Sequence, residues 1–437
     1  QLMSRLDRIN NYLDKLIDIK AQRQVRLQHL NQKLAESNFN DSEKEEYKKE
    51  LQQRETEYLR QLRIKITYDS FIPIATLGRG ASGVVLLVRY KLDQKLYALK
   101  VLRKNQVIER KQQDYLKLER DLMASSLSKY IVKFHSSFQD DQNLYLVMEY
   151  APGGDLMGLL MRQDRLPEIA AKFYTHELVE AFNDLHKHHI IYRDGKPDNI
   201  LITNSGHIKL TDFGLSCQAQ SLRQPEFCTC ELTHNALQQN ICQNCGKVQQ
   251  RMQHTNPRLQ AFSTVGTLNY TAPEMFGKSG YSEKCDFWAV GCILFEMLFG
   301  CAPFQTDSYR ETKTRIIKNQ QYLVVPTGVS PYCVDFIKRL ICDADKRMGY
   351  AQISAHPWMK QCPTEPSFIP KLKNEVDTQY FDQASKPIDV HAKSAFFVDN
   401  GEFAEFSQRY FPFTQGPNTS GKPSIKDLFI DMGVKKM

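Results

Sequence analysis

Three polar side chains near the middle of the chain are of the types that phosphoryl transfer requires. Asp194 and Asn199 lie in one short tract, and Asp212 opens an Asp-Phe-Gly triplet just downstream. A carboxylate can accept the proton of an attacking hydroxyl, while a second carboxylate and an amide oxygen can hold Mg²⁺ against phosphates. Lys196 could balance the departing charge. The pattern therefore predicts catalytic roles for Asp194 and Lys196, and magnesium-binding roles for Asn199 and Asp212.

An ordinary polar turn is the simplest alternative, because aspartate, lysine and asparagine beside a proline often form turns. Two motifs occur together, however. Arg-Asp-x-Lys-Pro-x-Asn spans residues 193–199 and Asp-Phe-Gly spans residues 212–214, with the apolar runs 200–202 and 208–210 between them. This combination is among the most specific signatures of a protein kinase, so ATP and Mg²⁺ are the expected substrate and cofactor.

A glycine-rich stretch upstream has the spacing Gly-x-Gly-x-x-Gly-x-Val over residues 78–85. Because glycine lacks a Cβ, its backbone amides can close over phosphates, although such glycines also form plain hairpins or dinucleotide sites. Lys100 favours the phosphate site, since a lone lysine in the apolar run 96–102 is costly to bury without an anion. Glu119, in the helical stretch 112–123, is the expected partner.

The adenine is expected to bind backbone groups at the end of the β-rich run 144–150, before the hinge-like Pro-Gly-Gly at residues 152–154. The complete predicted nucleotide-binding set is Gly78, Gly80, Gly83, Val85, Ala98, Lys100, Glu119, Met148, Glu149 and Tyr150.

The order of strand-like and helical patterns predicts an α+β, bilobal protein kinase fold. A chain of 437 residues is too long for one compact core. We predict a kinase domain at residues 71–358, with a β-rich small lobe at 71–150 and a helical large lobe at 153–358. A C-terminal tail follows at 359–437. Glu274, which closes the activation segment, is expected to pair with Arg347.

Composition excludes several classes of protein. Hydrophobic residues make up 41% of the chain without an uninterrupted apolar run long enough to span a bilayer, so no membrane span is expected. The net charge of +8 is mild for this length, and no nucleic-acid partner is predicted. The 11 scattered cysteines, without a recognisable signal peptide, favour a reducing compartment. We expect a cytoplasmic location, with the nucleus as a second one. Because the chain begins at Gln1, an upstream segment could precede it.

Residues 1–66 are rich in charged residues and glutamine and are predicted to form two antiparallel helices. Apolar residues recur at helical spacing, with a break at residues 36–41, and Ser42 with Glu45 fits a capping box that would start the second helix. A hairpin this small is not expected to bury its own apolar stripe, so we expect it to dock on the neighbouring domain or on another protein. Its basic residues fit an acidic partner, a homodimer or a merely solvated helix face.

The motifs taken together resemble the AGC group of serine/threonine protein kinases, and most closely its NDR/LATS family. The resemblance covers nearly the whole chain, and its most specific parts are residues 55–60, residues 261–267 before the Ala-Pro-Glu triplet, and residues 403–407. Residues 380–382 resemble the tail segment that packs near the nucleotide in AGC kinases. The resemblance implies a non-specific serine/threonine protein kinase.

The resemblance also implies regulation. Ser263 matches the activation-loop phosphosite and Ser407 the hydrophobic-motif phosphosite, so an upstream activating kinase is expected. Arg23 and Arg26 fall where the family presents basic residues to a Mob-type coactivator. Physically, phosphate on Ser407 could dock on a basic groove of the small lobe, and phosphate on Ser263 could pair with Arg193.

Acidic residues predict the substrate class. Asp155, Asp198 and Glu296 match positions where basophilic AGC kinases place acids around the peptide groove. Protein substrates with Arg or Lys before the target Ser or Thr are therefore expected. The alternative for Glu296 is an internal ion pair.

Two features depart from the family pattern. Gly195 stands where the catalytic loop normally has an aliphatic residue, and its missing side chain is expected to loosen the packing beneath Asp194 by about 1 kcal/mol or somewhat more. The long activation-segment insert, residues 217–260, contains four clustered cysteines. Four thiolates suit tetrahedral Zn²⁺, and the four predicted ligands are Cys228, Cys230, Cys242 and Cys245. Against zinc, Cys-x-Cys is a less usual half-site, His234 and His254 offer competing ligands, and a disordered loop is the alternative.

Two further hypotheses belong to other classes of function. A catalytically weak scaffold that binds a Mob-like protein through residues 1–66 is supported only by Gly195. A nucleotide-binding switch without transfer activity would require the loss of an acid or lysine, and all of these residues are present.

Overall fold

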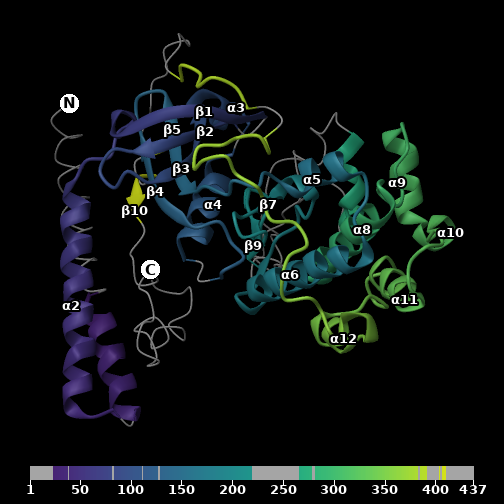
Figure 1. Ribbon diagram of the computed structural model, residues 1–437, viewed down its shortest axis with the longest axis horizontal. Helices are drawn as coiled ribbons and strands as arrows, with labels where there is room; N and C mark the ends of the chain where they lie inside the picture. Colours follow the sequence, from purple (N-terminus) through teal and green to yellow (C-terminus); the bar gives the residue numbers. More distant parts are fainter. Residues whose placement is uncertain are drawn as a thin grey trace, which may run out of the picture. The chain divides into compact units, whose positions relative to one another are not determined.

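The computed structural model of the 437-residue chain describes residues 23–37, 39–80, 83–110, 112–125, 128–218, 265–277, 281–381, 384–390, 403 and 406–409 (Figure 1). The chain divides into two compact units. The first contains Gln1–Lys129, Lys133–Tyr150 and Ser385–Met437, and the second contains Tyr130–Val132 and Ala151–Ala384. The tail, predicted as one segment from residue 359, is therefore shared between both units.

An antiparallel sheet with the strand order β1-β2-β3-β5-β4-β10 forms the centre of the first unit (Figure 1). Alternation along β2 places Leu86, Val88 and Tyr90 on one buried face, where the rings of Phe138 and Tyr145 stack with their centroids 4.5 Å apart. The strands are β1 (Phe71–Gly80), β2 (Gly83–Tyr90), β3 (Leu96–Arg103), β4 (Phe134–Gln139), β5 (Asn143–Glu149) and β10 (Gln408–Arg409), and the helices are α3 (Lys104–Glu109) and α4 (Gln113–Ser125).

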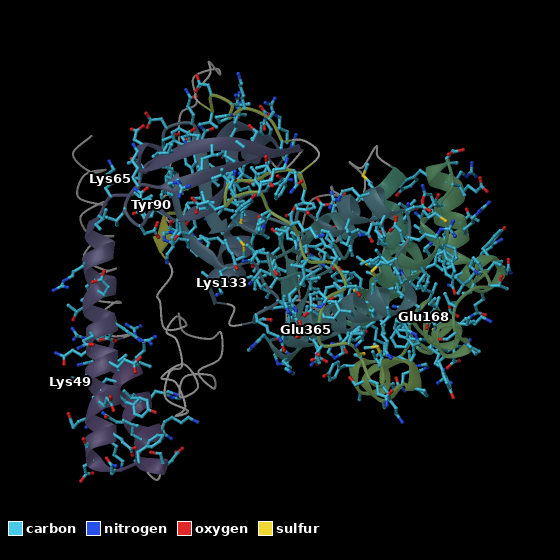
Figure 2. All side chains as sticks on the ribbon, in the orientation of Figure 1. Lys49, Lys65, Tyr90, Lys133, Glu168 and Glu365 are labelled. Carbon is cyan, nitrogen blue, oxygen red and sulfur yellow. The ribbon has the colours of Figure 1, made fainter. Side chains whose placement is uncertain are left out.

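The N-terminal part of the first unit contains the predicted helical hairpin. Residues 23–36 are helical and α2 spans Asp41–Arg63. Leu30 and Leu34 from the first helix are buried, as are Tyr47 and Leu51 from α2, whereas Lys49 stands exposed on α2 (Figure 2). Part of the apolar stripe that we expected to need a docking surface is therefore buried, whereas Leu27 on the first helix stays exposed.

The start of α2 differs from the predicted capping box. The side chain of Asn40 accepts a hydrogen bond from the Glu43 amide at 2.9 Å, and the Glu43 carboxylate accepts one from the Asn40 amide at 3.0 Å. The prediction that Ser42 and Glu45 form the box was wrong by two residues. Asparagine is as good an N-cap as serine, and this earlier start adds hydrogen-bonded residues to the helix.

Helices dominate the second unit. Every residue of α8 from Cys285 to Leu298 is buried, as expected of a helix that is apolar on all sides. Two short antiparallel sheets pair β6 (Ile190–Ile191) with β9 (Cys217–Gln218), and β7 (Ile200–Ile202) with β8 (Ile208–Leu210). The helices are α5 (Leu156–Gln163), α6 (Glu168–Lys187), α8 (Lys284–Phe299), α9 (Tyr309–Ile317), α10 (Asn319–Tyr322), α11 (Pro331–Leu340) and α12 (Tyr350–Ala355). Within the described part of the chain, no helix is long and apolar enough to cross a membrane.

The first part of the tail runs along the second unit. A Cβ on Gly153 would lie only 2.8 Å from the Cγ of Pro370, so this glycine allows the tail to approach closely. Arg162 of α5 lies 5.0 Å from the ring centroid of Tyr380, within the range of a cation–π contact. Phe381 ends this described stretch, and the last residue of the predicted segment 380–382 lies outside the described residues.

Candidate active site

The predicted base lies in a tight polar cluster of the second unit. Asp194 is buried, and the Nζ of Lys196 lies 3.1 Å from its Oδ2. The Nδ2 of Asn199 donates to the same oxygen at 2.8 Å and to the Asp194 main-chain carbonyl at 3.0 Å. The structure thus brings three predicted residues together, all within the loop after β6 and the short 3₁₀ turn Pro197–Asn199.

A carboxylate from α8 holds the backbone just before this cluster. Asp286 accepts hydrogen bonds from the backbone amides of Tyr192 at 2.9 Å and Arg193 at 2.8 Å, and from His186 at 2.8 Å. Arg193 has a φ of 68°, an uncommon conformation for a residue with a Cβ. The buried carboxylate therefore stabilises the strained backbone that presents Asp194.

Burial is the main cause that raises the pKa of Asp194 above its ordinary value. Lys196 lowers the pKa of this carboxyl again, since the ammonium favours the ionised form, whereas the Asp212 carboxylate raises it. Burial, Asp194 and Asp212 also raise the pKa of Tyr192. Asp194 and Asp212 therefore lie in one electrostatic neighbourhood.

A hairpin brings the two predicted magnesium ligands together. Ile200 of β7 pairs with Leu210 of β8. Asn199 directly precedes β7 and Asp212 lies just after β8, so both residues lie at the same end of this strand pair. There the Thr211 amide donates to the Asn199 carbonyl at 3.1 Å. Both hydrogens of the Asn199 amide point to Asp194, which leaves its oxygen as the atom that could face a cation.

This donor set fits Mg²⁺. The ion prefers hard oxygen ligands, and in phosphoryl-transfer sites it is held by one or two carboxylates together with substrate phosphates. The residues that the structure describes contain no cluster of three or more His, Cys, Asp or Glu side chains that could hold a metal. When bound, Mg²⁺ neutralises phosphate charge.

The first unit contains the predicted phosphate-binding residues. Lys100 and Glu119 are both buried, and their side chains form an ion pair at 2.7 Å. Gly83 has a φ of 116° and is required by the hairpin between β1 and β2. By contrast, a Cβ on Gly78 or Gly80 would meet none of the described residues within 4 Å, so packing against the described part of the chain does not require these two glycines. Such open space suits the approach of a phosphate to the backbone.

Other predicted nucleotide contacts lie on the same sheet. Val85 and Ala98 are half-buried on β2 and β3. Met148 is buried at the end of β5, and the Glu149 amide donates to the Lys133 carbonyl at 2.9 Å. The Glu149 amide is therefore occupied by the protein, so an adenine would have to use other backbone groups of residues 148–150.

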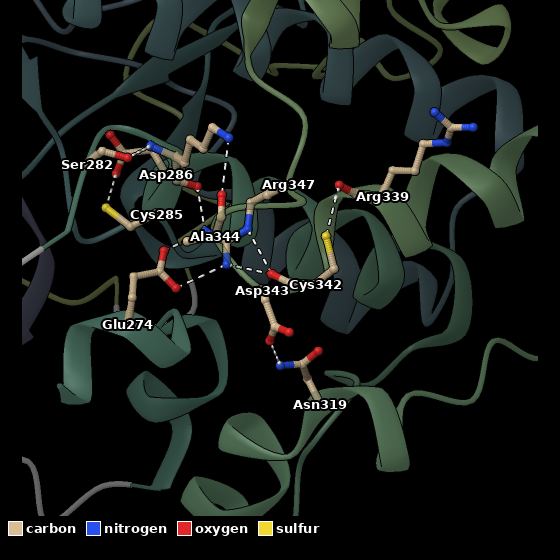
Figure 3. A network of polar contacts seen from close by, with 11 residues as sticks. Glu274, Ser282, Cys285, Asp286, Asn319, Arg339, Cys342, Asp343, Ala344 and Arg347 are labelled. Carbon is tan, nitrogen blue, oxygen red and sulfur yellow. Dashed lines mark hydrogen bonds and ion pairs between the residues drawn. The ribbon is translucent and has the colours of Figure 1, made fainter. Parts of the chain in front are cut away.

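The predicted pair of Glu274 and Arg347 is present (Figure 3). The guanidinium of Arg347 has no exposure to solvent and contacts the two Glu274 oxygens at 2.5 and 3.1 Å. It also donates to the carbonyls of Cys342 at 2.8 Å and Lys284 at 2.9 Å. This network joins the end of the activation segment to α8 and to the loop after α11.

The three acidic residues predicted for substrate recognition have different surroundings. Asp155 caps α5 by accepting from the Gly158 amide at 2.7 Å, and Asp198 is exposed. Glu296 accepts a hydrogen bond from the Tyr270 hydroxyl at 2.5 Å. Burial raises the pKa of Glu296, and the Asp198 carboxylate adds to the rise, so these two acids are neighbours. The described partner of Glu296 is a hydroxyl rather than a cation.

The remaining predicted sites fall partly outside the described residues. Ser263 and the four cysteines Cys228, Cys230, Cys242 and Cys245 lie there. Ser407 is exposed. Arg23 and Arg26 both form ion pairs with Glu55 inside the helical hairpin, at 2.6 and 3.2 Å.

Asp286 and His186 belong to none of the motifs that predicted site residues. An available signal was the single acidic residue in the first turn of a buried, apolar helix, because a buried carboxylate must find hydrogen-bond donors. The positions of those donors, nearly a hundred residues earlier in the chain, were not apparent from the sequence.

Comparison with known proteins agrees with this geometry. The family model described as a protein kinase domain matches residues 71–240 and 245–359. The probable serine/threonine-protein kinase ndrB of Dictyostelium discoideum is 38% identical over 400 residues, which cover 86% of this chain and 74% of that protein. The serine/threonine-protein kinase tricornered of Drosophila pseudoobscura pseudoobscura is 33% identical over 436 residues, which cover 98% of this chain and 92% of that protein.

A third relative is longer. The mouse serine/threonine-protein kinase LATS2 is 37% identical over 464 residues, covering 97% of this chain but only 44% of LATS2. The matches include the segments before and after the kinase domain as well as the domain itself. The chain therefore belongs to the NDR/LATS family of AGC-group serine/threonine protein kinases, enzymes that use ATP and Mg²⁺.

Proposed function

We propose that this kinase phosphorylates Ser or Thr in proteins that carry basic residues before the target, with Asp194 as the base for the incoming hydroxyl. The observation that carries the assignment of the base is the contact of Lys196 and Asn199 with one oxygen of Asp194. These contacts orient the carboxylate, and the nearby ammonium favours its ionised form despite burial.

Other residues position the phosphates. Lys100, steadied by the buried Glu119, supplies a positive charge for phosphate oxygens. Asn199 and Asp212 offer oxygen ligands to Mg²⁺. Gly78 and Gly80, whose Cβ positions are open, let backbone amides approach the nucleotide.

The acidic neighbours Glu296 and Asp198 support the choice of basic substrates. Glu296 shares a hydrogen bond with a neutral hydroxyl, so its negative charge is not cancelled by that partner. Asp198 is exposed and can meet a peptide directly. Together they would favour an approaching Arg or Lys and disfavour an acidic residue.

Peptide kinetics test this specificity. Replacing the Arg and Lys residues before the target Ser by Ala should lower kcat/KM by about tenfold, the effect of losing one charged hydrogen bond. Asp198→Asn should reduce that difference, whereas Asp307→Asn, at another exposed aspartate, should not. Equal rates for basic and neutral peptides, or a preference for acidic ones, would contradict the proposal.

The hydrophobic motif supports regulation through Ser407. Phe403 and Phe406 are fully buried in the first unit, and the Phe406 carbonyl accepts from Arg120 at 3.0 Å and from Ser137 at 2.6 Å. Ser407 itself is exposed. The two rings can therefore hold the segment while the hydroxyl stays accessible, and its phosphorylation would add negative charge beside Arg120.

The surface of the helical hairpin supports the proposal that it binds a Mob-type coactivator. The Arg23 side chain is 45% exposed, and the neighbouring Val25 and Leu27 are exposed apolar residues. Arg26, by contrast, is buried against Glu55. We assign Arg23 to the partner's surface and Arg26 to the internal stability of the hairpin.

Activity measurements with and without a Mob-type protein test the proposed regulation by this partner and by phosphorylation of Ser407. The partner should raise the activity of the phosphorylated wild type, and Arg23→Ala should weaken this response while Lys49→Ala leaves it intact. Ser407→Ala should lower activation by an upstream kinase. A partner that neither binds nor activates would contradict the proposal, and a chain that dimerises instead would point to self-association through the hairpin.

The predicted sites of the activation segment fall outside the described residues. We propose that Ser263 is the second phosphosite and that Cys228, Cys230, Cys242 and Cys245 bind structural Zn²⁺. Metal analysis of the purified chain should find about one zinc per chain, which Cys242→Ser abolishes. A metal-free, fully active protein would contradict the zinc proposal.

We also propose a cytoplasmic location, with the nucleus as a second one. Free thiols such as Cys285, Cys292 and Cys333 in the described part of the chain support a reducing compartment. Microscopy of the fluorescently tagged protein tests this location, and exclusive retention in the secretory pathway would contradict it.

A further inference from the structure

Gly195 lies next to the proposed base, and its backbone does not explain why a glycine stands there. Gly195 is not among the described residues with positive φ, so its backbone conformation is open to other amino acids. The residue is buried. The requirement for glycine must therefore come from the space around it.

That space is already filled. A Cβ on Gly195 would lie 2.8 Å from the Cβ of Ala289 and 3.4 Å from the Cζ of Phe182. Both neighbours are buried, Ala289 in α8 and Phe182 in α6. The loose packing that we expected beneath Asp194 is not found, because these two helices occupy the volume of the missing side chain.

The contact with Ala289 continues a contact already described. Asp286 and Ala289 are three residues apart on α8 and so face the same side of the helix. Asp286 binds the backbone amides of Tyr192 and Arg193, and Ala289 meets Gly195. One side of α8 therefore contacts the backbone on both sides of Asp194.

We propose that Gly195 is a positioning residue, whose close contact with Ala289 sets the position of Asp194 for catalysis. This inference rests on the proposed role of Asp194 as the base. A methyl group added at residue 195 must push the loop away from α8, because a buried helix cannot yield easily. Such a shift would disturb the contacts of Asp194 with Lys196 and Asn199. Even a small displacement of a catalytic group from its reactive position lowers the rate strongly.

A double-mutant cycle tests the proposal in the full chain. Gly195→Ala should lower kcat on the order of 10- to 100-fold with little change in the KM for ATP. Ala289→Gly, which removes the opposing methyl group, should recover most of the lost kcat when combined with Gly195→Ala. The single Ala289→Gly variant completes the cycle. Gly349→Ala is the matched control, since a Cβ there would meet none of the described residues within 4 Å, and its kcat should equal that of wild type.

Several outcomes would overturn the proposal. Unchanged kcat in Gly195→Ala, or a loss that Ala289→Gly does not relieve, would show that the contact does not position the base. If Gly195→Ala fails to fold, the double variant decides: a folded and active double variant supports the proposal, and an unfolded one overturns it. An active Asp194→Asn variant would instead refute the proposed base, whatever the result at Gly195.

Discussion

Asp194→Asn is expected to lower kcat for peptide phosphorylation by about two to four orders of magnitude, the usual contribution of a general base. Asparagine has nearly the same size, so the fold should persist, but its amide cannot accept the proton of the substrate hydroxyl. The KM for ATP should change little, because Lys100 and Glu119 are unaltered. Steady-state kinetics with Mg²⁺, ATP and a basic peptide measure the effect.

The control for this substitution is Asp307→Asn, which makes the same chemical change at an exposed position and should retain wild-type kcat. Phosphorylation by Asp194→Asn at a rate close to that of wild type would remove Asp194 from the chemistry. If the wild type itself were no faster than the variant, even when phosphorylated and bound to its partner, the scaffold hypothesis would gain support.

The pH dependence of kcat gives a second readout of Asp194. The base acts only when ionised, and burial raises its pKa. As the pH is lowered, kcat should therefore begin to fall at a higher pH than it would with an aspartate of ordinary pKa. Lys196 lowers the pKa of Asp194, and Lys196→Ala should therefore shift this acid limb to higher pH. Lys318→Ala, at an exposed lysine, should leave the limb unchanged.

Arg347→Ala is expected to cause the largest loss of stability, about 3–5 kcal/mol in the free energy of unfolding. The substitution leaves the Glu274 carboxylate without its partner and removes the donors to the carbonyls of Cys342 and Lys284. It also removes the guanidinium that lies 5.1 Å from the ring of Trp288. Equilibrium unfolding in urea, followed by tryptophan fluorescence, measures the change.

A double variant and a surface control separate the causes of this loss of stability. Glu274→Ala combined with Arg347→Ala should cost less than the sum of both single substitutions, because the orphaned carboxylate is then absent. Arg310→Ala, at an exposed arginine of α9, should change stability by no more than about 0.5 kcal/mol. A similarly small effect of Arg347→Ala would mean that the buried network contributes little to the fold.

Some local predictions failed where two solutions of similar energy were available. Asn40 and Glu43, rather than Ser42 and Glu45, cap α2, because either pair can satisfy the backbone amides of its own two residues and the structure uses the earlier pair. The hairpin likewise buries Leu30 and Leu34 against α2, which required knowing how the two helices face each other.

The class of enzyme and the polar side chains proposed for its chemistry could be predicted from the motifs alone. Asp194, Lys196 and Asn199 lie within one short loop, so their spacing along the chain nearly specifies their spacing in space. A single pairing of short strands then places Asp212 close to them. Lys100 was recognisable for a similar reason, since an isolated charge in an apolar strand requires a buried partner.

The support of the site became apparent only from the packing of distant segments. The contacts of Asp286 with Tyr192 and of Ala289 with Gly195 join segments that are far apart in the sequence, and no local pattern encodes which helix faces which loop. Gly195 illustrates why such support is not predictable from the sequence. Its effect depends on whether the space beside it is empty or filled, and only the packing of α6 and α8 determines that.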